Sequence, residues 1–257
     1  MNNINNTNLD LAVWFSTPSL ALGEIAKNVG YRTAVLDIEH GNFDLADLER
    51  FVPALKWLGF KVYAKVLGPF REAIQQGLDF GADGVIIPHI EGEEHARKVC
   101  GFSKFPPLGD RSSAGGRTQN YGMADDAWFK EQDIKTKCFP MIEDAGAFAE
   151  VEKILALDCV DGIFIGPTDL SLRRERGSYK RSAGDWDDLA IIAEAANRAG
   201  KPWIFPAWSE VEKRFALDKG AATILLTMEH IAISAGLNQA WDQMQSVVRE
   251  AERGSQE

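Results

Sequence analysis

Short apolar runs alternate with longer amphipathic segments along the whole chain. The short runs predict strands near residues 10–15, 33–38, 61–67, 83–88, 137–142, 160–165, 202–207 and 222–227. Apolar residues at helical spacing predict helices at 18–29, 44–58, 69–80, 91–103, 145–156, 185–199, 209–219 and 229–250. Eight repeats of one strand and one helix predict a closed (β/α)₈ barrel, or TIM barrel, in a single domain of residues 1–257.

Two segments depart from this alternation. Residues 105–135 are too long for a plain connection, and segments of that length are usually functional or disordered. Residues 172–184 hold five basic residues and two glycines, a composition typical of a mobile lid or an oligomer contact. The first strand is not followed by the glycine-rich turn of a dinucleotide-binding fold, which favours the barrel over an open sheet.

The charge balance narrows the classes of partner. The chain has 38 acidic and 28 basic residues and a net charge of −10, which argues against nucleic acid or an anionic membrane as the main partner. Three cysteines at positions 100, 138 and 159 lack metal-type spacing and are expected to be buried thiols in a reducing compartment. The start, MNNINNTNLD, has no targeting pattern, and no apolar run reaches 18 residues, so we expect a soluble cytoplasmic protein.

Two of the predicted strands are followed by carboxylates. Glu143 comes directly after the run Cys138–Ile142, and Asp169 lies just past the glycine-proline turn after Val160–Ile165. Neighbouring parallel strands lie roughly 5 Å apart, so acids at the same end can share one divalent cation. The sequence therefore predicts a metal site formed by Glu143 and Asp169.

His40 is the strongest candidate for an acid/base group. It follows an apolar strand and two acids, and Gly41 after it allows a sharp turn at the end of the barrel where chemistry is expected. The alternative is a hydrogen-bonded or helix-capping histidine. The other three histidines are weaker candidates, because apolar Ile90 follows His89, His95 lies in an acidic helical segment and His230 opens the last helix.

Lys65 lies among apolar residues of the third strand and is predicted to point into the barrel. A buried ammonium needs a partner, because an unpaired one costs several kcal/mol. It can serve as a cation for a substrate carboxylate or enolate, as a structural partner of Asp37 or Glu39, or as a nucleophile that forms an imine. Trp14, at the end of the first strand, either walls the substrate pocket or is an ordinary buried barrel residue.

Several strings of the sequence resemble one known family. VLDIEHGNFDL, LDFGADGVIIPHIEGEEHAR, FPPLGDRS, PMIED and VDGIFIGPTDLS are similar to the HpcH/HpaI family of metal-dependent pyruvate aldolases, over residues 14–226. The resemblance implies that Glu143 and Asp169 are the metal ligands and that His40 is the general base. It also implies that Asp79 of a neighbouring subunit orients His40. The implied assembly is a hexamer, a trimer of dimers that exchange the last helix.

The chain also departs from the family pattern. Lys65 replaces an arginine, and Met141 replaces a glutamine beside the metal. Strand 8 ends in Leu226-Thr227-Met228-Glu229 instead of small residues. Lysine supplies charge but not the planar, two-pronged donor of arginine, so these departures leave the identity of the substrate undetermined.

The resemblance implies a reaction at C3 of pyruvate or oxaloacetate, with an aldehyde as the other partner. Mg²⁺, Mn²⁺ or Co²⁺ would stabilise an enolate as the carbon–carbon bond forms or breaks. Amides around Gly166, Pro167 and Thr168 would orient the acid group, Lys65 would stand by the enolate oxygen, and His40 would take the hydroxyl proton. Two alternatives remain, an imine-forming aldolase that uses Lys65 and a non-catalytic binder of 2-oxo acids.

Overall fold

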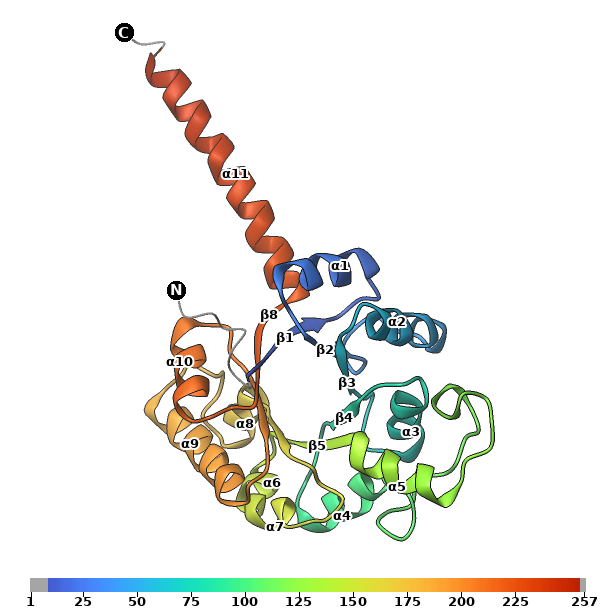
Figure 1. The fold of residues 1–257 in the computed structure, drawn as a ribbon. Coiled ribbons are helices and arrows are strands. Elements are labelled where there is room, and N and C mark those ends of the chain that lie inside the picture. The colour runs from blue at the N-terminus through green and yellow to red at the C-terminus, as the bar shows by residue number, and fades with distance from the viewer. Residues whose placement is uncertain (1–8, 255–257) are drawn as a thin grey trace.

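A closed barrel of eight parallel strands, paired in chain order, forms the centre of the computed structural model, which describes residues 9–254 (Figure 1). The strands are β1 (Asp10–Phe15), β2 (Thr33–Asp37), β3 (Lys61–Lys65), β4 (Gly84–Ile87), β5 (Lys137–Ile142), β6 (Ile163–Ile165), β7 (Trp203–Pro206) and β8 (Thr223–Met228). The predicted fold class is confirmed, and each predicted strand contains an observed one or extends no more than one residue short of it. The polar start of the chain, used above to argue against a targeting segment, lies largely outside the described residues.

The helices surround the barrel. They are α1 (Leu20–Val29), α2 (Leu45–Trp57), α3 (Arg71–Asp79), α4 (Glu93–Gly101), α5 (Asp126–Lys135), α6 (Ala145–Ala149), α7 (Val151–Leu155), α8 (Pro167–Arg173), α9 (Ala183–Arg198), α10 (Glu210–Asp218) and α11 (Glu229–Gly254). Side chains of Ser19, Asp44, Ser182 and Ser209 cap α1, α2, α9 and α10, which explains where these helices begin.

Three helical details differ from the prediction. The helix expected at 145–156 is divided into α6 and α7 at Glu150, where the backbone leaves the helical region (φ −112°, ψ 17°). The segment 105–135 is not a plain loop, because it contains α5 and a short 3₁₀ helix at Arg117–Gln119. None of the residues of α5 is buried, so it lacks the apolar stripe by which helices are found in a sequence. The short α8 was not predicted.

Alternating side chains of the strands build two apolar layers. On β1, Ala12 and Trp14 belong to the cluster inside the barrel, whereas Val13 and Phe15 pack in the layer between the barrel and the helices. This alternation follows from the period of two in a strand. The three cysteines are buried free thiols, as predicted, and burial raises the pKa of Cys159 to about 11.

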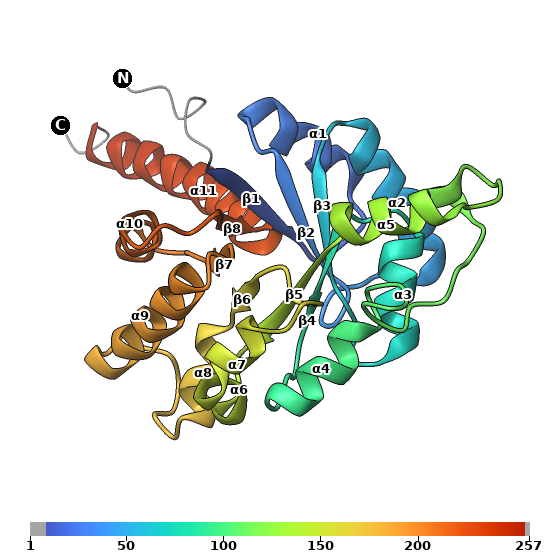
Figure 2. The same cartoon turned by 60° about the horizontal axis from the view of Figure 1, so that its bottom comes forward.

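Helix α11 extends beyond the ring of helices in both views (Figures 1 and 2). Its exposed apolar residues include Ile233, Leu237, Trp241 and Met244. An exposed apolar stripe of this kind is typical of an interaction surface, which supports the predicted exchange of this helix between subunits; the exchange stays a prediction. No helix within residues 9–254 combines the length and the apolar character needed to cross a membrane.

The basic segment 172–184 is fastened to the barrel by ion pairs. Arg174 Nε lies 3.0 Å from a carboxylate oxygen of Asp188, and Arg176 pairs with the same carboxylate. Arg181 Nε lies 3.0 Å from a carboxylate oxygen of Glu212. Both acids are buried in their helices, so these pairs link the segment that follows α8 to α9 and α10.

Candidate active site

A cavity of about 370 Å³ opens at the carboxyl ends of the strands. Its volume falls in the range of small-molecule pockets, roughly 300–1,000 Å³. Nine predicted site residues line it, namely Trp14, His40, Lys65, Met141, Glu143, Gly166, Pro167, Thr168 and Asp169. The remaining lining residues are Asp37, Glu39, His89, Phe164, Pro206, Trp208 and Met228.

The two predicted metal acids meet at the ends of β5 and β6. Ile142 is in register with Ile165, so Glu143 and Gly166 are the next residues on neighbouring strands. A side chain at Gly166 would begin 2.8 Å from Glu143 Cβ, so only glycine leaves room for the acid. Burial raises the pKa of Glu143 above its ordinary value, and the nearby charge of Asp169 acts in the same direction. Each proton or cation bound here therefore relieves repulsion between two acids.

Lys65 is held by two carboxylates. The register pairs Lys65 on β3 with Asp37 on β2, and the ammonium lies 3.1 Å from Asp37 Oδ1. A second hydrogen bond goes to Glu39. Burial opposes the charge of Glu39, but the hydrogen bond and charge of Lys65, together with the charge of His40 and the hydrogen bond from His89, outweigh it, so the pKa of Glu39 is lowered. The structural pairing expected as one alternative is present with both acids. Within the described residues the ammonium has no third hydrogen-bond partner, so its third N–H remains for a ligand.

His40 lies on a tight turn at the mouth of the cavity. Its amide donates to Asp37 Oδ1 at 3.3 Å, and its ring lies 3.5 Å from Glu39. The amide of Gly41 donates to the carbonyl of Asp37 at 2.9 Å, and a side chain at Gly41 would collide with that carbonyl. The exposed ring, with a side chain 69% accessible, can therefore exchange protons with a ligand or solvent.

His89 joins the two acidic groups of the cavity. Its ring bonds to Glu39, and its amide donates to Glu143 Oε1 at 2.8 Å. The residue has a left-handed backbone, with φ of 58°. From the sequence alone His89 is a weak candidate, because an apolar residue follows it. The signal that could have found it is its place two residues after strand β4, at the same barrel end as the acids.

The opposite side of the cavity is apolar. Phe164, Trp208 and Met228 line it with Trp14, and none of these three was a predicted site residue. Trp14 Nε1 donates to Asp37 Oδ2 at 3.1 Å, so Trp14 both walls the cavity and positions the carboxylate that holds Lys65. The departure at the end of strand 8 has a structural use, because Glu229 accepts from the amides of Ser16 at 2.9 Å and Thr17 at 3.0 Å.

The turn after β6 offers fewer donors than predicted. The amide of Gly166 donates to the carbonyl of Ile142 at 3.1 Å, and Pro167 has no N–H. Within residues 9–254 the amide of Thr168 has no partner. Thr168 is therefore the residue of the predicted trio whose amide can serve a substrate.

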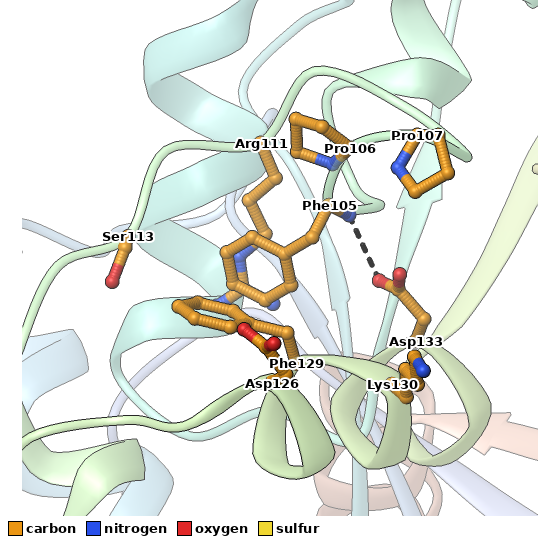
Figure 3. A pocket seen from close by; sticks show the side chains of 9 residues that line it. All are labelled: Phe105, Pro106, Pro107, Arg111, Ser113, Asp126, Phe129, Lys130 and Asp133. Atoms are coloured by element: carbon orange, nitrogen blue, oxygen red, sulfur yellow. Dashed lines mark hydrogen bonds between the residues drawn. The ribbon is translucent and has the colours of Figure 1, made fainter.

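Asp79 does not line the cavity. It ends α3, which places it at the end of the barrel opposite the carboxyl ends of the strands. Its Oδ1 accepts a hydrogen bond from Arg111 Nη2 at 2.8 Å. A second cavity of about 430 Å³ lies beside Arg111 (Figure 3). There the Phe105 ring lies 4.7 Å from the guanidinium and packs on Phe129. The proposed action of Asp79 in a neighbouring subunit is compatible with this place and stays a prediction.

Comparison with known proteins agrees with the barrel fold. Residues 11–203 match the family model of HpcH/HpaI aldolase/citrate lyase. The chain is 29% identical over 196 residues to 2-keto-3-deoxy-L-rhamnonate aldolase of Klebsiella pneumoniae, covering 74% of this chain and 72% of that one. It is 30% identical over 162 residues to 2-dehydro-3,6-dideoxy-6-sulfogluconate aldolase of Pseudomonas putida, covering 63% of each.

A solved structure shows the same architecture. The HpcH/HpaI aldolase from Desulfitobacterium hafniense DCB-2 superposes with a TM-score of 0.85 at 22% identity, covering 93% of both chains. At 22% identity this likeness shows the fold alone. The family is shown by the family model, which matches most of the barrel sequence. The chain belongs to the HpcH/HpaI aldolase/citrate lyase family and is a carbon–carbon lyase of the aldolase type.

Proposed function

We propose that the chain is a divalent-metal-dependent aldolase that forms or cleaves a bond at C3 of pyruvate or oxaloacetate, with an aldehyde as the other partner. The observation that carries the proposal is the pair Glu143 and Asp169. Glu143 is buried, and its pKa is raised in part by Asp169. Asp169 takes part in no ion pair within the described residues.

The charges around the cavity suit a cation. Four carboxylates and one lysine line it, and Lys65 is already paired with two of the four. The described residues contain no group of three or more metal-binding side chains. Two carboxylates with open positions fit Mg²⁺ or Mn²⁺, which commonly bind through one or two acids together with substrate oxygens. Such a cation, when bound, would supply a Lewis acid for the keto oxygen.

The side chains of the chain divide the remaining work. The third N–H of Lys65 is available to the oxygen on which negative charge develops. In cleavage, His40 accepts the proton of the C4 hydroxyl, directly or through water, as the C3–C4 bond breaks and the aldehyde leaves. Carbon C3 then takes up a proton and pyruvate is complete. The amide of Thr168 is available to the substrate carboxylate.

The contacts of Lys65 speak against the imine alternative. Imine formation needs a neutral amine, and carboxylates of Asp37 and Glu39 both stabilise the charged ammonium. We therefore propose a charge-stabilising role for Lys65 and keep the imine route as an outcome of the test.

The experiment follows deuterium exchange at the methyl group of pyruvate by NMR, with and without a chelator. Exchange should require added Mg²⁺, Mn²⁺ or Co²⁺. Calorimetric titration of Glu143→Ala and Asp169→Ala should show loss of metal binding in a folded barrel. Undiminished metal affinity in both variants, or exchange that a chelator leaves unchanged, would contradict the proposal. Binding of pyruvate without any exchange would favour a non-catalytic binder.

A further inference from the structure

The cavity has two unlike halves. Its charged half lies at the ends of β2 to β5 and on α8, where every acid, the lysine and both histidines are found. Its apolar half lies at the ends of β1, β6, β7 and β8, with Trp14, Phe164, Pro206, Trp208 and Met228. This division is not needed to bind a small 2-oxo acid, so it bears on the second substrate.

The proposed function assigns the charged half to the 2-oxo acid, because Glu143 and Asp169 lie there. The acceptor must then lie against the apolar half. In the barrel order β1 neighbours β2, so an aldehyde that rests on Trp14 lies beside the turn that carries His40. The body of the aldehyde then extends over Trp208 and Met228.

The rings of the apolar half form a fixed corner. Trp14 packs edge to face on Phe164, with ring centres 5.9 Å apart, and on Trp208, with centres 6.4 Å apart. Trp208 and Met228 pack on the apolar cluster inside the barrel while remaining partly exposed to the cavity. A further ring can extend this edge-to-face arrangement, and a methionine adapts to its outline.

Charged and hydroxyl-rich acceptors find few partners there. Lys65, the one lysine or arginine among the described lining residues, is already held by two carboxylates. Among the described residues of the apolar half, only Trp14 and Trp208 carry a side-chain donor. The indole N–H of Trp14 donates to Asp37, so that of Trp208 is the one left for a ligand there. A buried hydroxyl or carboxylate without a partner opposes binding.

We propose that the preferred acceptor is an uncharged aldehyde with an aromatic or similarly apolar body. The inference rests on the proposed function and names the class of its second substrate. In the direction of bond formation, C3 of pyruvate loses a proton and the electron pair left on C3 forms the bond to the aldehyde carbon. The aldehyde oxygen takes up a proton, so pyruvate and aldehyde combine into one 4-hydroxy-2-oxo acid without loss of atoms.

The test compares three acceptors with pyruvate and the metal that supports exchange. Benzaldehyde probes an apolar body, glycolaldehyde a hydroxylated one and succinic semialdehyde an anionic one. We expect kcat/KM for benzaldehyde to exceed both others by about tenfold or more, as apolar pockets discriminate by roughly 10- to 200-fold per group. A value for either polar aldehyde that equals or exceeds that for benzaldehyde overturns the inference.

Variants test whether the apolar half causes the preference. Trp208→Ala should lower the ratio of benzaldehyde to glycolaldehyde by about tenfold, whereas Trp208→Phe should keep most of it. Met228→Lys adds a cation and should raise kcat/KM for succinic semialdehyde, relative to that for benzaldehyde, by about tenfold. Trp57→Ala, which removes an exposed tryptophan that does not line this cavity, is the matched control and should leave the ratios unchanged. Unaltered ratios in both the Trp208→Ala and the Met228→Lys proteins overturn the inference.

Methyl-group exchange of pyruvate without any aldehyde distinguishes a failure of the acceptor inference from a failure of the proposed function. Metal-dependent exchange together with the wrong acceptor preference overturns this inference alone. Absent or chelator-insensitive exchange overturns the proposed function as well.

Discussion

Replacing Lys65 with methionine removes the charge that two buried carboxylates share. The exposed fractions of the three side chains are 4% for Lys65, 6% for Asp37 and 9% for Glu39. Breaking a buried ion pair by removing one partner costs roughly 3–5 kcal/mol. Asp37 keeps its bond from Trp14, and Glu39 keeps its bond to His89, so we expect the lower end, about 3 kcal/mol.

A loss of this size is measurable by thermal unfolding. For a chain of about 250 residues, 1 kcal/mol shifts Tm by roughly 2–4 °C, so Lys65→Met should melt about 6–12 °C lower. Lys65→Arg should stay near the parent, because a guanidinium can pair with both acids. The matched control is Lys56→Met, whose half-exposed pair with Asp83 should contribute no more than about 1 kcal/mol.

The exchange assay on the same proteins tests the chemical role. Loss of one preorganised donor costs roughly 10²- to 10³-fold in rate, so Lys65→Met should lower pyruvate exchange by that factor, whereas Lys65→Arg should retain it. A Lys65→Met protein that melts within about 2 °C of the parent and exchanges at the parent rate would refute the reasoning. Loss of exchange in both variants, together with chelator-insensitive exchange in the parent protein, would indicate an imine.

Three further predictions follow from other parts of the structure. His40→Ala should lower turnover by about 10²- to 10⁴-fold with metal affinity kept, and mixing its subunits with those of Asp79→Ala should restore activity only if the two residues act across subunits. His89→Gly should be more stable than His89→Ala by about 1 kcal/mol and should melt at a higher temperature, because only glycine adopts the left-handed backbone at φ 58° without strain. Equal melting temperatures of the two variants would contradict this. Burial opposes the charge of Asp188, but hydrogen bonds from Arg176 and Arg174 lower its pKa below that of the unfolded chain, about 3.9. The stability that the ionised Asp188 gives to the folded state is therefore complete above that unfolded-state pKa and is lost as the pH falls through the folded-state pKa. Stability of Asp188→Asn measured by denaturant titration should therefore fall less steeply than that of the parent below about pH 4, and parallel curves would exclude this pair as the cause.

The barrel and most of its site could be predicted from the pattern of the chain alone. Apolar runs of strand length, repeated eight times with helical segments between them, leave few architectures for a chain of 257 residues. Because parallel strands all end on the same side, residues that directly follow a run, such as Glu143 and His40, had to share one end of the barrel. Asp79 is the last residue of α3, and because each helix runs back toward the start of the next strand, Asp79 lies at the other end.

Tertiary structure decided what these residues contact. The register of β2 with β3 sets Lys65 beside Asp37, and the turn after β2 brings Glu39 to the same ammonium. His89, Trp208 and Met228 come from three different strand ends; their places at those ends assign them to one end of the barrel, but nothing in their sequence neighbours shows which other side chains they meet. Sequence periodicity reports which face of an element is buried, whereas the closure of the barrel determines which side chains from distant elements converge, and the chemistry of the site depends on that convergence.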